Sequence, residues 1–167
     1  MRLFIAIRFS PEILSALEDA QTQLRLLGKG GNFSRKENLH LTLAFIGESE
    51  DVRTLRRIME QSVGAPFPLA LGGSGHFDDL YWAGIAPNPA LQALAKRLIR
   101  ALREAGFEIE DRPFTPHITL VRQLRCMEKP RLHIPPAEMT VREISLMRSE
   151  HMQGKLVYTE LFSCPMK

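Results

Sequence analysis

Two copies of one short pattern, His-apolar-Thr-Leu, constrain this chain more than any other feature of its sequence. The first copy is His40-Leu41-Thr42-Leu43, and the second is His117-Ile118-Thr119-Leu120. Alternate side chains of a β-strand point to opposite faces, so each copy places a His and a Thr on one face and two apolar side chains on the other. The repeat therefore predicts two related halves. We expect their His-Thr strands to face each other across a cleft, around an approximate two-fold axis.

The four polar side chains of the repeat are suited to chemistry at phosphorus. Two imidazoles can divide the general-acid and general-base roles near neutral pH, because the ordinary pKa of His lies near 6.5. Two hydroxyls can donate hydrogen bonds to the non-bridging oxygens of a phosphate. We therefore predict that His40 and His117 are catalytic and that Thr42 and Thr119 bind phosphate. This scheme needs neither a metal ion nor any other cofactor.

Other functional interpretations of the repeat are weaker. A metal site is the main competitor, but two His with no Cys and no carboxylate at short spacing make a poor ligand set. A Ser-His-Asp hydrolase is weaker still, because the chain has no Gly-x-Ser-x-Gly nucleophile elbow.

The composition describes an ordinary globular protein. The chain has 167 residues, of which 44% are apolar and 25% charged, and a net charge of +3. That charge suits an anionic substrate but is too small for a protein that coats DNA. No apolar run approaches the roughly 18 residues of a membrane span, and Cys126 and Cys164 make no disulfide framework. We expect a monomeric, cytoplasmic protein with one domain over residues 1–167 and no membrane partner.

Apolar periodicity and the positions of Gly and Pro predict an α+β fold. Ser10 and Pro11 open a helix that ends before Gly28, and further helices are expected over about 49–63 and 89–105. Strands are expected at 3–9, 39–46, 67–71, 80–86, 117–121, 139–147 and 156–162. Strands that follow one another without a helix imply antiparallel pairing. Residues 28–31 and 72–75 are interpreted as glycine-rich turns, and residues 125–136 as a loop.

Several other residues have two interpretations. Arg122 follows the second motif and could bind phosphate or form a structural salt bridge, and strict alternation would turn it away from Thr119. Phe45, Trp82 and Tyr158 could stack on a base, but packing in the core is favoured for each of them. We interpret the remaining histidines, His76, His133 and His151, as loop residues.

The paired motifs and their surroundings resemble the 2H phosphoesterase superfamily. Within it, the sequence is similar to the bacterial and archaeal RNA 2′,3′-cyclic phosphodiesterases, also called 2′-5′ RNA ligases. The resemblance covers nearly the whole chain. It is carried by residues 2–7 with Ser10-Pro11-Glu12, by 37–47, 80–84 and 113–122, and by the tail from Ile144 to Tyr158.

The resemblance implies a bilobal fold, with two antiparallel sheets, outer helices and a central cleft lined by the two motifs. It implies that His40 protonates the leaving ribose oxygen, that His117 activates water, and that Thr42, Thr119 and Arg122 hold the phosphate. The substrate would be RNA with a 2′,3′-cyclic phosphate end, such as a tRNA half, and the product a 2′-phosphate. Reversible 2′-5′ joining of RNA halves would be a side activity.

Two alternatives remain open beside this interpretation. The chain could be a 2H phosphodiesterase for another cyclic phosphate or for a 2′-5′ oligonucleotide, because that chemistry is shared. It could also be a non-catalytic module that binds RNA ends, although two intact motifs argue against this.

Overall fold

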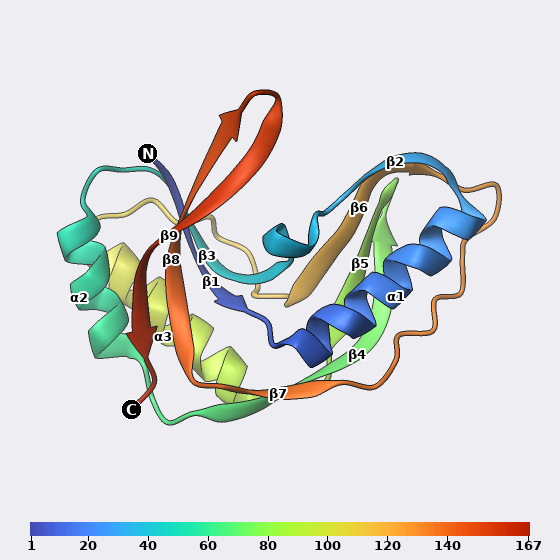
Figure 1. The fold of residues 1–167 in the computed structure, drawn as a ribbon. Helices are drawn as coiled ribbons and strands as arrows, with labels where there is room; N and C mark the ends of the chain where they lie inside the picture. The colour runs from blue at the N-terminus through green and yellow to red at the C-terminus, as the bar shows by residue number, and fades with distance from the viewer.

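The computed structural model describes residues 1–167 as two lobes, each built on one antiparallel sheet (Figure 1). The first sheet has the order β3-β1-β8-β9, with strands at His40–Glu48, Arg2–Arg8, Glu143–Met152 and Lys155–Pro165. The second has the order β2-β6-β5-β4-β7, with strands at Lys29–Phe33, His117–Arg125, Leu80–Ile85, Phe67–Phe77 and Glu138–Val141. Every strand pair is antiparallel, which confirms the α+β prediction.

Three helices and one 3-10 turn complete the fold: α1 (Pro11–Leu27), α2 (Val52–Ser62), α3 (Pro89–Glu104) and η1 (Lys36–Asn38). Helix α1 follows β1 of the first lobe but packs on β6 and β7, whereas α3 follows β5 of the second lobe and packs on β3 and α2. The lobes thus exchange helices. One cluster of 34 buried residues takes members from both sheets.

The first helix begins as the sequence predicts. The Ser10 side chain accepts a hydrogen bond from the backbone N–H of Ile13, and Pro11 occupies the first turn. None of the helices is long and apolar enough to cross a membrane.

Strand β1 is buried on both faces from Leu3 to Ile7, as its continuous apolar sequence predicts. Leu3, Ile5 and Ile7 join the main core under the helices. Phe4 and Ala6 form a second small cluster with Met147, on the opposite face of the sheet.

The glycine-rich segment 72–75 is not the turn that the sequence analysis expects. It lies inside β4, and the reversal into β5 falls at Asp78 and Asp79 instead. The glycines permit close packing between the strands: a Cβ on Gly75 would lie 2.2 Å from the Trp82 ring. Because β4 continues to Phe77, His76 belongs to a strand rather than a loop. Its ring stacks on that of Tyr81, with 5.5 Å between the ring centroids.

Two further boundaries also differ from expectation. The expected turn at 28–31 overlaps the edge strand β2, which pairs with β6 and takes positive φ at Gly30 and Gly31. The expected strand 139–147 is divided at Arg142, because β7 pairs with β4 in the second sheet and β8 with β1 in the first. Local sequence patterns cannot reveal this change of partner.

Leu41 lies between the two polar residues of the first motif and is fully buried, whereas Leu26 on α1 is 83% exposed. We expect Leu41→Ala to lower the free energy of unfolding by about 2–5 kcal/mol, through lost burial and a residual cavity. Leu26→Ala should change it by about 0.5 kcal/mol or less. Urea unfolding followed by circular dichroism measures both. Equal effects would contradict the inward orientation of Leu41.

Candidate active site

The two motif histidines are held in the same way. The Nδ1 atom of His40 lies 2.7 Å from the carbonyl oxygen of Asn38, and Nδ1 of His117 lies 2.9 Å from that of Thr115. A carbonyl oxygen only accepts, so each Nδ1 carries a proton, and each neutral ring keeps its lone pair on Nε2. In His40, Nε2 lies 2.9 Å from the Thr42 hydroxyl, which donates to it when the ring is neutral. Both imidazoles are thus oriented before any ligand binds.

The environment of His40 lowers its pKa below the ordinary value of 6.5. Burial is the largest cause, because it disfavours the charged imidazolium. The carbonyl of Asn38 partly opposes this effect, while the positive charges of Arg122 and His117 lower the pKa further. Arg122 and His117 come from β6 in the second lobe, so the structure brings the predicted residues of both motifs into electrostatic range. Strands β3 and β6 also contact each other.

A β-bulge resets the side-chain alternation at the same place in each motif. Leu43 has no partner in the pairing of β3 with β1, and Leu120 has none in the pairing of β6 with β5. As a result, Phe45 and Arg122, at matching positions after the two bulges, are exposed instead of buried. The bulge is the physical reason why Arg122 lies near the site, although strict alternation would turn it away from Thr119. Arg122 forms no salt bridge, and its guanidinium is unpaired.

Hydrogen bonds from Gln21 and Ser34 support the second bulge. The carbonyl oxygen of Leu120 accepts from the Gln21 side chain and from the backbone N–H of Ser34, each at 3.0 Å. The Ser34 hydroxyl donates to the carbonyl of Thr119 at 3.0 Å. Gln21 is polar but only 3% exposed, because its helix α1 packs on β6. A lone Gln in a helix carries no sequence signal of such a role, so this support could not be predicted.

Aromatic rings surround both histidines. Phe4 and Tyr158 lie 4.9 and 5.1 Å from the His40 ring, and burial raises the pKa of the Tyr158 hydroxyl. On the other lobe Phe77 lies 5.7 Å from His117. Core packing is the wrong interpretation for Phe45, which is 63% exposed.

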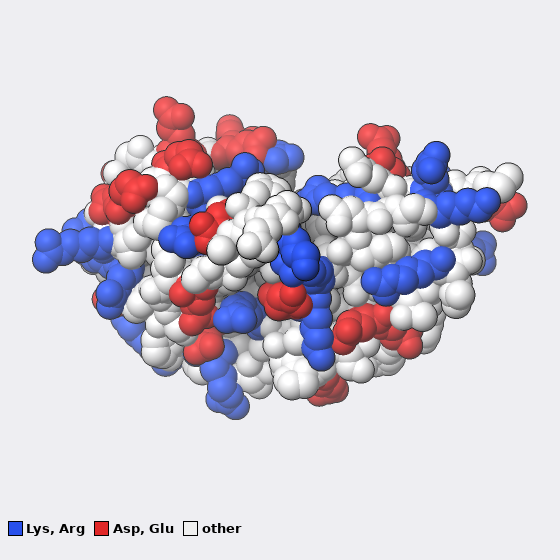
Figure 2. Space-filling view, turned by 45° about the horizontal axis from the view of Figure 1, so that its top comes forward, with Lys and Arg blue, Asp and Glu red and all other residues white.

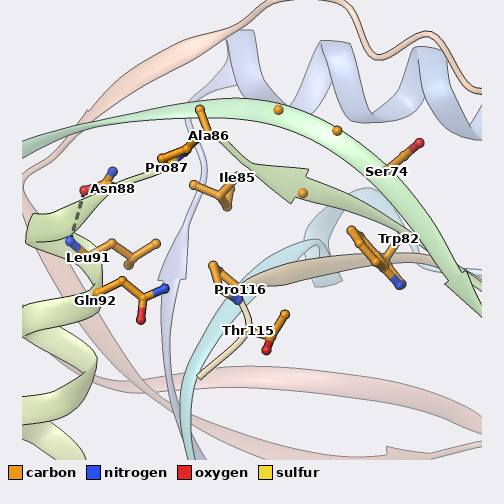
Figure 3. Close-up of a pocket in the computed structure, with 13 residues that line it drawn as sticks. Ser74, Trp82, Ile85, Ala86, Pro87, Asn88, Leu91, Gln92, Thr115 and Pro116 are labelled. Atoms are coloured by element: carbon orange, nitrogen blue, oxygen red, sulfur yellow. Dashed lines mark hydrogen bonds between the residues drawn. The ribbon is translucent and has the colours of Figure 1, made fainter. Parts of the chain in front are cut away.

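Trp82 lies 6.2 Å from His117 and lines a pocket of about 340 Å³ beside the second motif (Figure 3). Thr115 and Pro116 form another wall of this pocket, and the start of α3 lies at its far end. The backbone that holds His117 therefore has a hollow next to it. This pocket has no signal in the sequence, because it forms where β4, β5, the start of α3 and residues 115–116 meet.

His133 and His151 lie in other segments of the chain. His133 is in a loop, as expected, whereas exposed His151 is near the end of β8 and not in a loop. No group of three or more His, Cys, Asp or Glu side chains is arranged to hold a metal ion.

Lys and Arg side chains lie along the junction of the lobes in Figure 2, with acidic side chains nearby, and they form no continuous basic face on that side.

The sequence is similar to those of known proteins over most of its length. A protein of Thermus thermophilus named RNA 2′,3′-cyclic phosphodiesterase is 33% identical over 96% of this chain and 88% of its own length. One of the same name from Escherichia coli is 31% identical over 96% of this chain and 93% of its own length.

The fold is also similar to those of solved structures. The structure of Escherichia coli LigT complexed with 3′-AMP matches 99% of this chain and 97% of its own, with a TM-score of 0.89 and 28% identity. A crystal structure of a Thermus thermophilus protein, TT0787, has a TM-score of 0.84 and 32% identity, over 99% of this chain and 98% of its own. Residues 10–153 match the sequence profile of the 2′-5′ RNA ligase superfamily, and the chain belongs to that family.

Proposed function

We propose that this chain hydrolyses the 2′,3′-cyclic phosphate ends of RNA to 2′-phosphates. The observation that carries the proposal is the pair of histidines from the two lobes, each fixed through Nδ1 and each beside a Thr on the same strand face. The names of the relatives support the same activity.

In the proposed reaction, Nε2 of His117 accepts a proton from water as the water oxygen bonds to phosphorus. The bond from phosphorus to O3′ breaks on the opposite side, and His40 donates its proton to O3′. Thr42, Thr119 and Arg122 hold the non-bridging oxygens, since hydroxyls and a guanidinium donate to a phosphate anion. The products are a 2′-phosphate and a free 3′-hydroxyl. One water is consumed, and proton exchange with solvent restores both histidines.

The same site would run the joining reaction if an RNA 5′-hydroxyl took the place of water. His117 would accept the proton of that hydroxyl, its oxygen would bond to phosphorus, and O3′ would leave as before. This forms a 2′-5′ linkage without ATP. The proposed partners are RNA halves with cyclic phosphate ends, such as tRNA halves, bound by a monomer in the cytoplasm.

Loss of either histidine tests the acid–base roles. We expect His40→Ala and His117→Ala each to lower kcat by about 10² to 10⁴-fold on an RNA with a 2′,3′-cyclic phosphate end. His133→Ala is the matched control, because only the backbone of His133 forms hydrogen bonds, to Gln23. Turnover and the identity of the product phosphate are followed by chromatography. Activity close to wild type in either motif variant would contradict the two-histidine reaction.

Metal removal tests the prediction that imidazoles are sufficient. We expect turnover to stay within about twofold after dialysis against EDTA, because general acid–base catalysis by two histidines requires no metal ion. A loss that added Mg²⁺ or Zn²⁺ restores would contradict the scheme.

The depressed pKa of His40 predicts a pH profile. The scheme requires a protonated His40 and a neutral His117 in the same molecule, so kcat/KM should be bell-shaped in pH. Because burial lowers the pKa of His40 below 6.5, it also limits the fraction of protein in that state. The anionic phosphate favours imidazolium and raises that pKa in the complex, so kcat should fall at a higher pH than kcat/KM. Stopped assays from pH 4.5 to 9 measure both profiles. A kcat/KM that rises with pH to a plateau and never falls would contradict the role of His40 as acid.

A further inference from the structure

A second pocket lies at the turn between β4 and β5, on the His117 side of the site. It has a volume of about 390 Å³. It is lined by Phe77, Asp78 and Asp79 from the turn, by Arg122 and Gln123 from β6, and by Asn32 from β2. The charge of Arg122 also lowers the pKa of His40, so this pocket lies within electrostatic range of the first motif.

The aromatic ring of Phe77 is exposed at this pocket and is supported by neighbouring rings. The side chain is 52% exposed, and its ring centroid lies 5.7 Å from both His117 and Trp82. Trp82 in turn lies against Gly75, where a Cβ would meet the indole at 2.2 Å. An exposed aromatic side chain next to a polar pocket is the kind of surface on which nucleic-acid bases stack.

The polar rim of the pocket favours a base over a second phosphate. Asp78 and Asp79 carry two negative charges against the single charge of Arg122, and no salt bridge pairs any of them. Ionised carboxylates only accept hydrogen bonds. They match a base edge that presents N–H donors side by side, as guanine does with its ring N–H and its amino group.

The backbone around the pocket is unusual. Only three non-glycine residues of the chain have positive φ, and two of them, Asp78 at 51° and Gln123 at 59°, line this pocket. Such residues are held in place by their surroundings and cluster at binding sites.

We propose that this pocket is a second nucleoside subsite, which takes a guanine-type base stacked on Phe77 with its N–H donors toward Asp78 and Asp79. The inference rests on the proposed function, because Arg122 connects the pocket to the phosphate position. Two sources of the base share this chemistry. It belongs either to the nucleotide that precedes the cyclic end or to the nucleoside across phosphorus, whose 5′-oxygen replaces water.

Three substrates separate these sources. Adenosine 2′,3′-cyclic phosphate has no second base. A dinucleotide with guanosine before an adenosine 2′,3′-cyclic phosphate places the guanine upstream. A 2′-5′-linked adenosine–guanosine dinucleotide places the guanine across phosphorus. In its cleavage the adenosine O3′ gives its proton to His40 and bonds to phosphorus, and the bond to O5′ breaks as His117 donates a proton to the leaving oxygen.

The variants are Phe77→Leu, which removes the ring, and Phe77→Tyr, which keeps it. We expect Phe77→Leu to lower kcat/KM for one dinucleotide about tenfold more than for the mononucleotide, and Phe77→Tyr to restore the difference. The dinucleotide affected identifies the source of the base. Leu26→Ala on α1 controls for general effects of a surface change. An equal loss on all three substrates, or no loss on any, would overturn the proposal.

A binding experiment separates this proposal from the proposed function. Trp82 is the only tryptophan of the chain and lies next to Phe77, so its fluorescence reports on the pocket. We expect guanosine to give a saturable change in fluorescence, weaker with inosine, which lacks the amino group, and lost in Phe77→Leu. A wild-type protein that binds guanosine in this way but leaves cyclic phosphates intact would refute the proposed reaction alone. The absence of a saturable change, or an equal change in Phe77→Leu, would refute the subsite alone.

Discussion

Burial of the apolar side chains of β3 and β6 is the constraint on which the site depends. Leu41 and Ile118 are fully buried between the polar residues of their motifs. A slip of either strand by one residue would expose such side chains and bury an imidazole and a hydroxyl instead. Each buried Leu or Ile contributes about 1.5–3 kcal/mol. The orientation of both His-Thr pairs therefore follows from the core, before any contact within the site forms.

The two halves of the site are alike in backbone but different in chemistry. Both strands carry a bulge one residue after the motif Thr, and both fix their His through a carbonyl two positions earlier. The positions that the bulges expose hold Phe45 on one lobe and Arg122 on the other. The exposed position is an apolar ring on the first lobe and a cation on the second. Matching bulges therefore carry unlike groups, and the cation proposed to bind phosphate is on the lobe of His117.

Much of the fold was open to prediction because its signals are local. Ser10 and Pro11 mark the start of α1, and the apolar run from Leu3 to Ile7 marks a strand covered on both faces. The errors arise where distant pairing decides. The glycines of residues 72–75 have the sequence of a turn, yet they lie in β4, which pairs with β5. At Gly75 the Trp82 ring occupies the space that a side chain would need.

By itself the sequence determined the two motifs, their strand faces and the residues proposed for catalysis, since these depend only on i, i+2 alternation. Only the tertiary structure decided that Arg122 lies near His40, that Phe45 is exposed and that burial lowers the pKa of His40. It also decided that Phe77 and Asp78 share a pocket with Arg122. The physical reason is that bulges, burial and pockets are set by contacts between strands far apart in the chain.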